Sequence, residues 1–278
     1  MRLGGPIFEK TTDPASWIAA MHRAGYSAGW LPVDANTPAD VTQSFVDAAA
    51  AANICIAEVG AWSNPISPDE ATRTKAIEHN CQQLAFADRL GARCCVNIAG
   101  ACGSQWDGPH PANLSDATFD LIVETVRRII DTVKPQRTFY TLETMPWVFP
   151  DSADSYLRLL RAIDRRQFAV HFDPVNLINC PSRYYRTGDF IRDCFAKLGP
   201  YIKSCHAKDI LLSGKLTVHL DEVRPGLGAL DYDVFLTELA KLDADVPLML
   251  EHLPNAGEYA LAAQHIRQVA TRNGVKFL

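Results

Sequence analysis

Four residues able to bind a metal or transfer a proton end four successive apolar segments: Glu143, Asp173, His206 and Glu251. Three carboxylates converging in a pocket of low dielectric would repel one another unless a cation lay between them. Three oxygen donors and one nitrogen donor suit Mn²⁺, Mg²⁺, Co²⁺ or Fe²⁺ better than a closed structural zinc site. Such a set also leaves coordination positions for a substrate, so the pattern predicts a catalytic metal site.

These four residues can meet only if their segments are neighbouring strands of one sheet. Short apolar segments rich in β-forming residues alternate with segments of helical periodicity, which is the pattern of βαβ units and a parallel sheet. We expect strands over residues 3–8, 29–33, 54–60, 93–98, 138–144, 168–173, 202–207 and 247–251. We expect helices over residues 14–24, 38–52, 67–90, 115–133, 152–163, 188–198, 231–242 and 257–273.

Eight strand–helix pairs in 278 residues predict a single (β/α)8 TIM barrel that spans residues 1–278 as one domain. A doubly wound open sheet is the competing architecture. It would usually carry Gly-x-Gly-x-x-Gly after the first strand, and Leu3-Gly4-Gly5-Pro6 does not match. In a barrel, function sits at the carboxyl ends of the strands, and strand alternation places Thr141, His171, Ser204 and Met249 in the next interior layer.

The composition restricts the partners. Lys and Arg number 27 against 32 Asp and Glu, a net charge of −5 without any basic run, which argues against nucleic-acid binding. No apolar segment approaches the roughly 20 residues that cross a bilayer, and the first residues lack the apolar core of a signal peptide, so we expect a cytoplasmic protein. The eight cysteines form no Cys-x-x-Cys pair and are expected to be free, mostly buried thiols.

Five motifs follow one another along the predicted strands. They are Leu142-Glu143, His171-Phe172-Asp173-Pro174-Val175-Asn176, Cys205-His206-Ala207-Lys208-Asp209, Arg224-Pro225-Gly226-Leu227-Gly228-Ala229-Leu230-Asp231-Tyr232 and Leu250-Glu251-His252. The succession resembles the xylose isomerase-like barrel superfamily, and more narrowly its sugar phosphate isomerases and epimerases.

This resemblance implies one divalent cation, Mn²⁺ first and Mg²⁺ or Co²⁺ as alternatives, held by Glu143, Asp173, His206 and Glu251. It implies that Glu143 and Glu251 also act as acid and base. They would remove a proton next to the carbonyl of a carbohydrate and return it through an enediolate, which isomerises or epimerises the sugar. Barrels of this family often associate, so a homo-oligomer is possible.

The sequence departs from the epimerase pattern at two positions. Asn176 stands where the family usually has a histidine, and Phe149 stands where a second glutamate often follows. Asn176 can still donate and accept hydrogen bonds to a substrate, but it cannot shuttle protons at neutral pH. Substrate contacts are therefore expected to differ from those of ketohexose epimerases.

Further substrate-binding candidates lie at the same barrel end. Glu58 and Asn97 end the third and fourth strands, where they could bind sugar hydroxyls or anchor loops. Lys208 and Arg224 would place positive charge near the mouth, or else pair with Asp209 and Glu222. The loops after strands three, four and five each carry a tryptophan that could cover a sugar ring or close a loop core: Trp62, Trp106 and Trp147.

The sequence leaves other functions open. A dehydratase or lyase acting on a keto-sugar, keto-inositol or 3-keto-glycoside would begin with the same proton abstraction. Apurinic endonucleases share the superfamily, but they need extra histidines and a basic groove. A non-catalytic sugar-binding barrel would not be expected to retain both Glu143 and Glu251.

Overall fold

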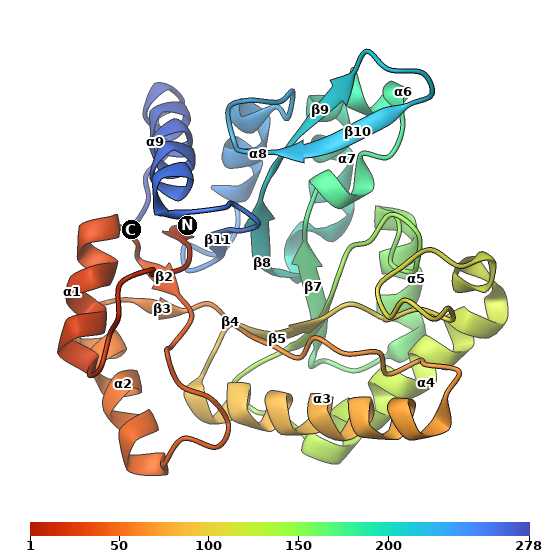
Figure 1. The fold of residues 1–278 in the computed structure, drawn as a ribbon, viewed down its shortest axis with the longest axis horizontal. Helices are drawn as coiled ribbons and strands as arrows, with labels where there is room; N and C mark the ends of the chain where they lie inside the picture. The colour runs from red at the N-terminus through yellow and green to blue at the C-terminus, as the bar shows by residue number, and fades with distance from the viewer.

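The computed structural model describes residues 1–278 and places a parallel sheet inside a ring of helices (Figure 1). The short strands of this sheet are buried on both faces, as in other parallel sheets covered by helices. Their bounds are β1 (Arg2–Gly4), β2 (Ala28–Gly29), β3 (Cys55–Ile56), β4 (Glu58–Gly60), β5 (Cys94–Asn97), β6 (Tyr140–Glu143), β7 (Phe168–Phe172), β8 (Ile202–Ala207) and β11 (Pro247–Leu250).

The sheet closes through the segment predicted as the third strand. Its order is β3-β2-β1-β11-β8-β7-β6-β5-β4, and only Ala57 separates the two end strands along the chain. β3 pairs with β2, β4 pairs with β5, and the Ala57 N–H donates to the Gly29 carbonyl at 3.0 Å. One segment thus joins both edges, which confirms the predicted eight-stranded barrel.

The first two strands are shorter than predicted because prolines follow them. β1 ends at Gly4 and β2 at Gly29, whereas the sequence predicted continuation to residues 8 and 33. Pro6 and Pro32 lack the N–H that a central strand must donate. At Gly4 the backbone passes so close to the Ala28 carbonyl that an added Cβ would overlap it.

The predicted helices are present, with ends that differ by a few residues. Asp13 and Ser152 accept the backbone N–H of Ser16 and Ser155, so each caps the helix that follows it. The helix bounds are α1 (Pro14–Ala24), α2 (Ala39–Ala51), α3 (Glu70–Leu90), α4 (Asp116–Val133), α5 (Ala153–Ile163), α6 (Pro181–Tyr184), α7 (Thr187–Leu198), α8 (Tyr232–Leu239) and α9 (Ala256–Arg272).

The ends of two helices were predicted wrongly. The predicted helix 67–90 begins only at Glu70, because Asp69 accepts the N–H of Thr72 and is its cap. The predicted helix 231–242 ends at Leu239, because the chain turns there before β11.

An antiparallel hairpin after β8 is absent from the sequence prediction. β9 (Asp209–Ser213) pairs with β10 (His219–Val223), and the hairpin projects from the barrel beside α6 (Figure 1). Within these two strands only Asp209 and Ile210 are buried. The hairpin therefore lacks the continuous apolar pattern by which the barrel strands were predicted.

Two further expectations concern the whole chain. All eight cysteines are free thiols, as predicted, and Cys94, Cys95, Cys194 and Cys205 are buried. None of the helices combines the length and the apolar character that crossing a membrane requires.

Candidate functional site

The structure brings Glu143, Asp173, His206 and Glu251 together at the carboxyl ends of four adjacent strands. Glu143 ends β6, Asp173 follows β7, His206 lies on β8 and Glu251 follows β11. One ligand atom from each lies within 4.8 Å of the others. We call these four residues the acidic cluster.

Short contacts to His206 hold the acidic cluster together. Its Nδ1 atom lies 2.8 Å from Glu251 Oε1, 3.2 Å from Glu143 Oε1 and 3.9 Å from Asp173 Oδ2. Asp173 and His206 are buried, and the Glu251 side chain keeps the largest exposure of the four, 14%.

Burial and charge shift the titration of these groups in opposite directions. Burial acts against the charge of Glu143, but His206 and Lys208 hold the pKa of that carboxyl well below its ordinary value. Burial raises the pKa of Asp173 to about 6, although Lys208 opposes the shift. Burial alone would lower the pKa of His206, whereas Glu251, Glu58 and Glu143 raise it well above its ordinary value. The acidic cluster therefore carries crowded negative charge, which favours the binding of a cation.

Lys208 lies inside the acidic cluster and not near the barrel mouth, where the sequence placed it. Its Nζ is 2.6 Å from Glu251 Oε1, 2.9 Å from Asp173 Oδ2 and 3.8 Å from Glu143 Oε1. It does not pair with Asp209, which accepts backbone N–H groups instead. Because the Lys208 side chain is only 2% exposed, its charge acts on the cluster without solvent screening.

The donor atoms of the acidic cluster fit a divalent cation. Three largely buried carboxylates share a single ammonium group, that of Lys208, and a single imidazole, that of His206. Buried carboxylates in such close contact repel one another, and an ion bound among them would remove that cost. Three oxygens and one imidazole nitrogen also suit Mn²⁺, Mg²⁺ or Co²⁺.

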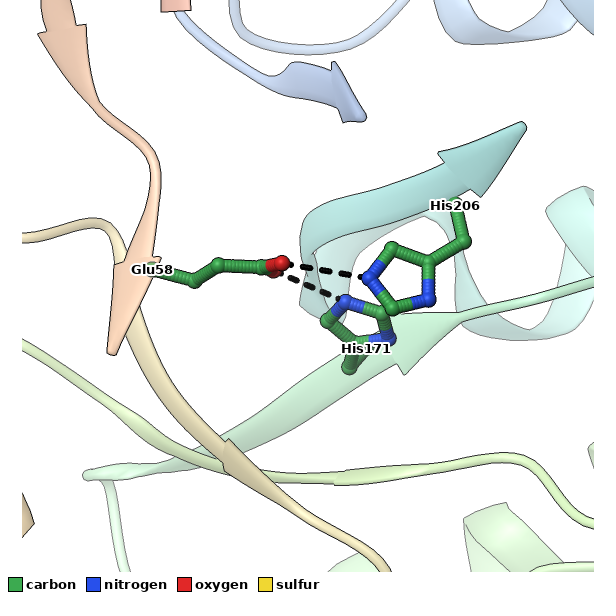
Figure 2. Close-up of side chains that lie close together, drawn as sticks. All are labelled: Glu58, His171 and His206. Carbon is green, nitrogen blue, oxygen red and sulfur yellow. Dashed lines mark hydrogen bonds and ion pairs between the residues drawn. The ribbon is translucent and has the colours of Figure 1, made fainter. Parts of the chain in front are cut away.

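The sequence left two roles open for Glu58, a contact to sugar hydroxyls or a loop anchor, and the structure gives both of its carboxylate oxygens protein partners. It extends from β4 across the barrel interior toward His171 and His206, as Figure 2 shows. Trp30 and Ser204 donate to the same carboxylate, at 3.2 Å and 3.0 Å. Glu58 is therefore a support beneath the acidic cluster.

Asn97 is likewise engaged by the protein. Its Oδ1 accepts the Ser63 N–H, and its Nδ2 donates to the Ser63 carbonyl and to Asn80 Oδ1. The side chain is fully buried. Asn97 anchors the loop after β4, which was the second interpretation of this residue from the sequence.

Asn176 and Arg224 occupy different surroundings. Asn176 Nδ2 donates to Glu143 Oε1 at 3.0 Å, so this amide contacts the acidic cluster directly. Arg224 pairs with Glu258 on α9 at 2.8 Å and not with Glu222, the partner that the sequence suggested. Arg224 thereby ties the chain after β10 to α9.

The three tryptophans lie in loops at the carboxyl end of the barrel and remain partly exposed. Their exposed fractions are 45% for Trp62, 39% for Trp106 and 38% for Trp147. Trp147 Nε1 donates to the Asp107 carbonyl at 2.8 Å, which joins the loops that follow β5 and β6.

The hairpin, which the sequence did not predict, contributes Glu222 to the site. Glu222 on β10 lies 3.6 Å from Lys208 Nζ, and its carboxylate also contacts His252 Nδ1 at 3.2 Å. The sequence offered Glu222 as an ion-pair partner for Lys208 or Arg224, and the structure places it near Lys208. The contact with His252 was not predicted, and only the position of His252 directly after Glu251 indicated it.

Comparison with solved structures shows the same fold in enzymes of several kinds. The probable 3-DHS dehydratase AsbF of Bacillus anthracis has 21% identity and a TM-score of 0.72, with 98% of this chain and 99% of that chain covered. D-Psicose 3-epimerase from Clostridium cellulolyticum H10, solved with D-tagatose, has 13% identity and a TM-score of 0.69, with 99% and 100% covered. A xylose isomerase-like TIM barrel protein from Mycobacterium smegmatis, solved with magnesium, has 17% identity and a TM-score of 0.66, with 94% and 90% covered.

The sequence was also compared with curated proteins and with models of protein families. No curated protein matches this chain. The family model of the xylose isomerase-like TIM barrel matches residues 18–269, which is most of the sequence. The chain belongs to the xylose isomerase-like TIM barrel family.

Proposed function

We propose that this protein is a divalent-metal-dependent isomerase or epimerase that acts on a sugar or keto-sugar. The observation that carries the proposal is the acidic cluster at the carboxyl ends of β6, β7, β8 and β11, where three largely buried carboxylates converge within 4.8 Å of one imidazole. This is the barrel end at which enzymes of this architecture place their chemistry.

The acidic cluster would hold the metal, with Mn²⁺ first and Mg²⁺ or Co²⁺ as alternatives. When bound there, a divalent cation polarises a carbonyl oxygen and makes the neighbouring C–H more acidic. The magnesium present in the Mycobacterium smegmatis structure supports a divalent ion in this fold.

Glu143 and Glu251 would transfer the proton. One carboxylate removes a proton from the carbon beside the carbonyl, and the electron pair moves toward oxygen to give an enediolate. The other carboxyl group returns a proton, either to the opposite face of the same carbon or to the adjacent carbon, and in the second case a proton also moves from the neighbouring hydroxyl to the former carbonyl oxygen. The first outcome is epimerisation, and the second is aldose–ketose isomerisation.

Neighbouring residues would orient and charge these two groups. The Asn176 amide donates to Glu143 Oε1 and fixes the direction in which that carboxylate presents its free lone pairs. The Lys208 ammonium lies 2.6 Å from Glu251 Oε1 and favours negative charge on oxygen during the reaction. A carbohydrate substrate is further supported by the three partly exposed tryptophans and by the D-psicose 3-epimerase fold.

Loss of water from a keto-sugar is the second candidate reaction. Lys208 is a cation among the carboxylates and could deliver a proton to a departing hydroxyl group after the same first step. The structural likeness to a probable dehydratase supports this alternative. The two reactions differ only in what happens to the enediolate.

Solvent exchange tests the proposal directly. Keto-sugars and aldoses incubated with the protein and Mn²⁺ in D2O should gain deuterium at the carbon next to the carbonyl, and chelation should stop the exchange. Glu143→Gln and Glu251→Gln should abolish it, whereas Glu124→Gln, an exposed change on α4, should not. Exchange that is indifferent to chelation or unchanged in both site variants would contradict the proposal. Formation of an unsaturated product would assign the dehydratase reaction instead.

A further inference from the structure

Glu58 collects four hydrogen-bond donors in the interior of the barrel. His206 Nε2 and Trp30 Nε1 lie 3.1 Å and 3.2 Å from Oε1, and His171 Nε2 and Ser204 Oγ lie 2.9 Å and 3.0 Å from Oε2. The Glu58 side chain is only 1% exposed, so water does not compete for these hydrogen bonds. Figure 2 shows the carboxylate aimed at both imidazole rings.

The contact between Glu58 and His206 keeps a hydrogen on Nε2 and fixes how the imidazole ring lies. A carboxylate oxygen can only accept, so Nε2 of His206 must donate to it. Its Nδ1 atom faces Glu251, Glu143 and Asp173 on the opposite side of the ring. The ring is thereby held with Nδ1 toward the acidic cluster.

His171 braces this arrangement from below. Its ring is perpendicular to that of His206, with centroids 4.1 Å apart and an interplanar angle of 75°. Its Nε2 donates to Glu58 Oε2, and its buried Nδ1 has no partner, so the interaction with Glu58 alone fixes the ring. Burial opposes charge on Glu58, but His206 and His171 hold the pKa of its carboxyl well below the ordinary value.

We propose that Glu58 is a positioning residue that orients His206 as a metal ligand, with His171 as its brace. A carboxylate that accepts the second N–H of a ligating histidine sets the ring orientation and raises its basicity, and removing it typically weakens metal binding 10- to 100-fold. The inference rests on the proposed metal site and adds residues that do not touch the metal.

Glu58, His171 and His206 also lie close enough together to suggest a second ion site. The contacts favour the supporting role. Nε2 of His171 and Nε2 of His206 both lie within hydrogen-bonding distance of the Glu58 carboxylate. Trp30 and Ser204 donate to the remaining acceptor positions of that carboxylate. A second ion would have to break most of these bonds.

Metal affinity provides the first test. Mn²⁺ binding, followed by the electron paramagnetic resonance of free Mn²⁺, should weaken at least tenfold in Glu58→Gln, which keeps the side-chain shape but removes the charge. Thr141→Val is the matched control, because Thr141 is buried in the barrel interior and its hydroxyl bonds only the Cys95 carbonyl. Ser204→Ala, a milder change, should weaken binding by a smaller factor if Glu58→Gln fails to fold. Unaltered Mn²⁺ affinity in the folded Glu58 variant, or in Ser204→Ala if that variant must replace it, would overturn the inference.

A metal-free measurement separates this inference from the proposed function. Nitrogen-15 NMR of histidine-labelled, metal-free protein, assigned with His206→Gln, should show an Nε2–H proton of His206 shifted strongly downfield by the Glu58 carboxylate, and this shift should shrink in Glu58→Gln. An Nε2–H resonance that is the same in both proteins would refute the positioning role whether or not the protein binds metal. If the resonance moves as expected but the wild type binds no Mn²⁺, the proposed function fails and the hydrogen-bond assignment stands.

Discussion

At the scale of single residues, the site buries charged side chains, although burial without partners would destabilise each charge. Lys208 and His206 share the space between three carboxylates, among them Asp173 Oδ2 and Glu251 Oε1 at 2.6–2.9 Å from the nearest nitrogen. Crowded buried carboxylates destabilise a fold, so their retention is consistent with a cation that binds among them. A local arrangement that is unfavourable for stability is typical of a functional site.

Asn176 offers a residue-scale test through pH dependence. Asn176→Asp places a second carboxylate beside Glu143 Oε1, where the amide donates at present. Like charge raises the pKa of Glu143. If Glu143 must be deprotonated to act, the acidic limb of the pH–rate profile should move to higher pH by about one unit, the usual size of such neighbour effects. Asn179→Asp, an exposed change in the same loop, is the control. An unmoved limb would argue against Glu143 as a base.

At the scale of elements, a single carboxylate organises the chain that follows the hairpin. Asp209 Oδ2 accepts the N–H of Gly226 and Gly228, at 2.9 Å and 3.0 Å. Its Oδ1 accepts those of Leu230 and Ile210, at 2.9 Å and 2.8 Å. The Pro-Gly-x-Gly motif is therefore a loop wrapped around Asp209, and this loop fixes the start of α8.

Removing that carboxylate should destabilise the fold. Asp209→Ala leaves the buried N–H groups of Ile210 and Leu230 without a partner, and each such group costs about 1–3 kcal/mol. We expect the free energy of unfolding in urea to fall by at least about 2 kcal/mol. The exposed Asp221 on β10 supplies the control, because Asp221→Ala should change it by less than about 0.5 kcal/mol. A small loss in Asp209→Ala would mean that the loop holds itself in place.

Prediction from sequence succeeded where local patterns decide the structure. The strand–helix alternation and the polar strand ends at Glu143 and Asp173 follow from periodicity and barrel geometry. The contact of Glu58 with His206 could not be predicted, because it crosses the barrel and depends on the stagger of β4 against β8. The burial of Lys208 was missed for the same reason, since its surroundings come from distant strands and an unrecognised hairpin.

At the scale of the whole molecule, the acidic cluster links the strands of one half of the barrel to one another. Its members come from β6, β7, β8 and β11, which are consecutive neighbours in the sheet. Glu58, from β4, reaches the same histidine from the opposite wall. Binding at the cluster is therefore expected to stabilise this half of the barrel, because its ligands meet only when the four strands are paired.

Thermal unfolding with and without metal tests this coupling. An ion that binds only the folded protein adds about 2.7 kcal/mol of stability at a concentration one hundred times its Kd. Mn²⁺ should therefore raise the Tm of the wild type, and chelation should reverse the rise. Asp173→Asn keeps the oxygen that accepts the N–H of Val175 and removes one of the crowded charges, so its metal-free Tm should equal or exceed that of the wild type. The same variant should lose most of the Mn²⁺ increment, because the amide is a poor ligand in place of a carboxylate. An increment of wild-type size in Asp173→Asn would place the ion elsewhere, whereas a lower metal-free Tm would show that the Asp173 carboxylate supports the fold even without metal.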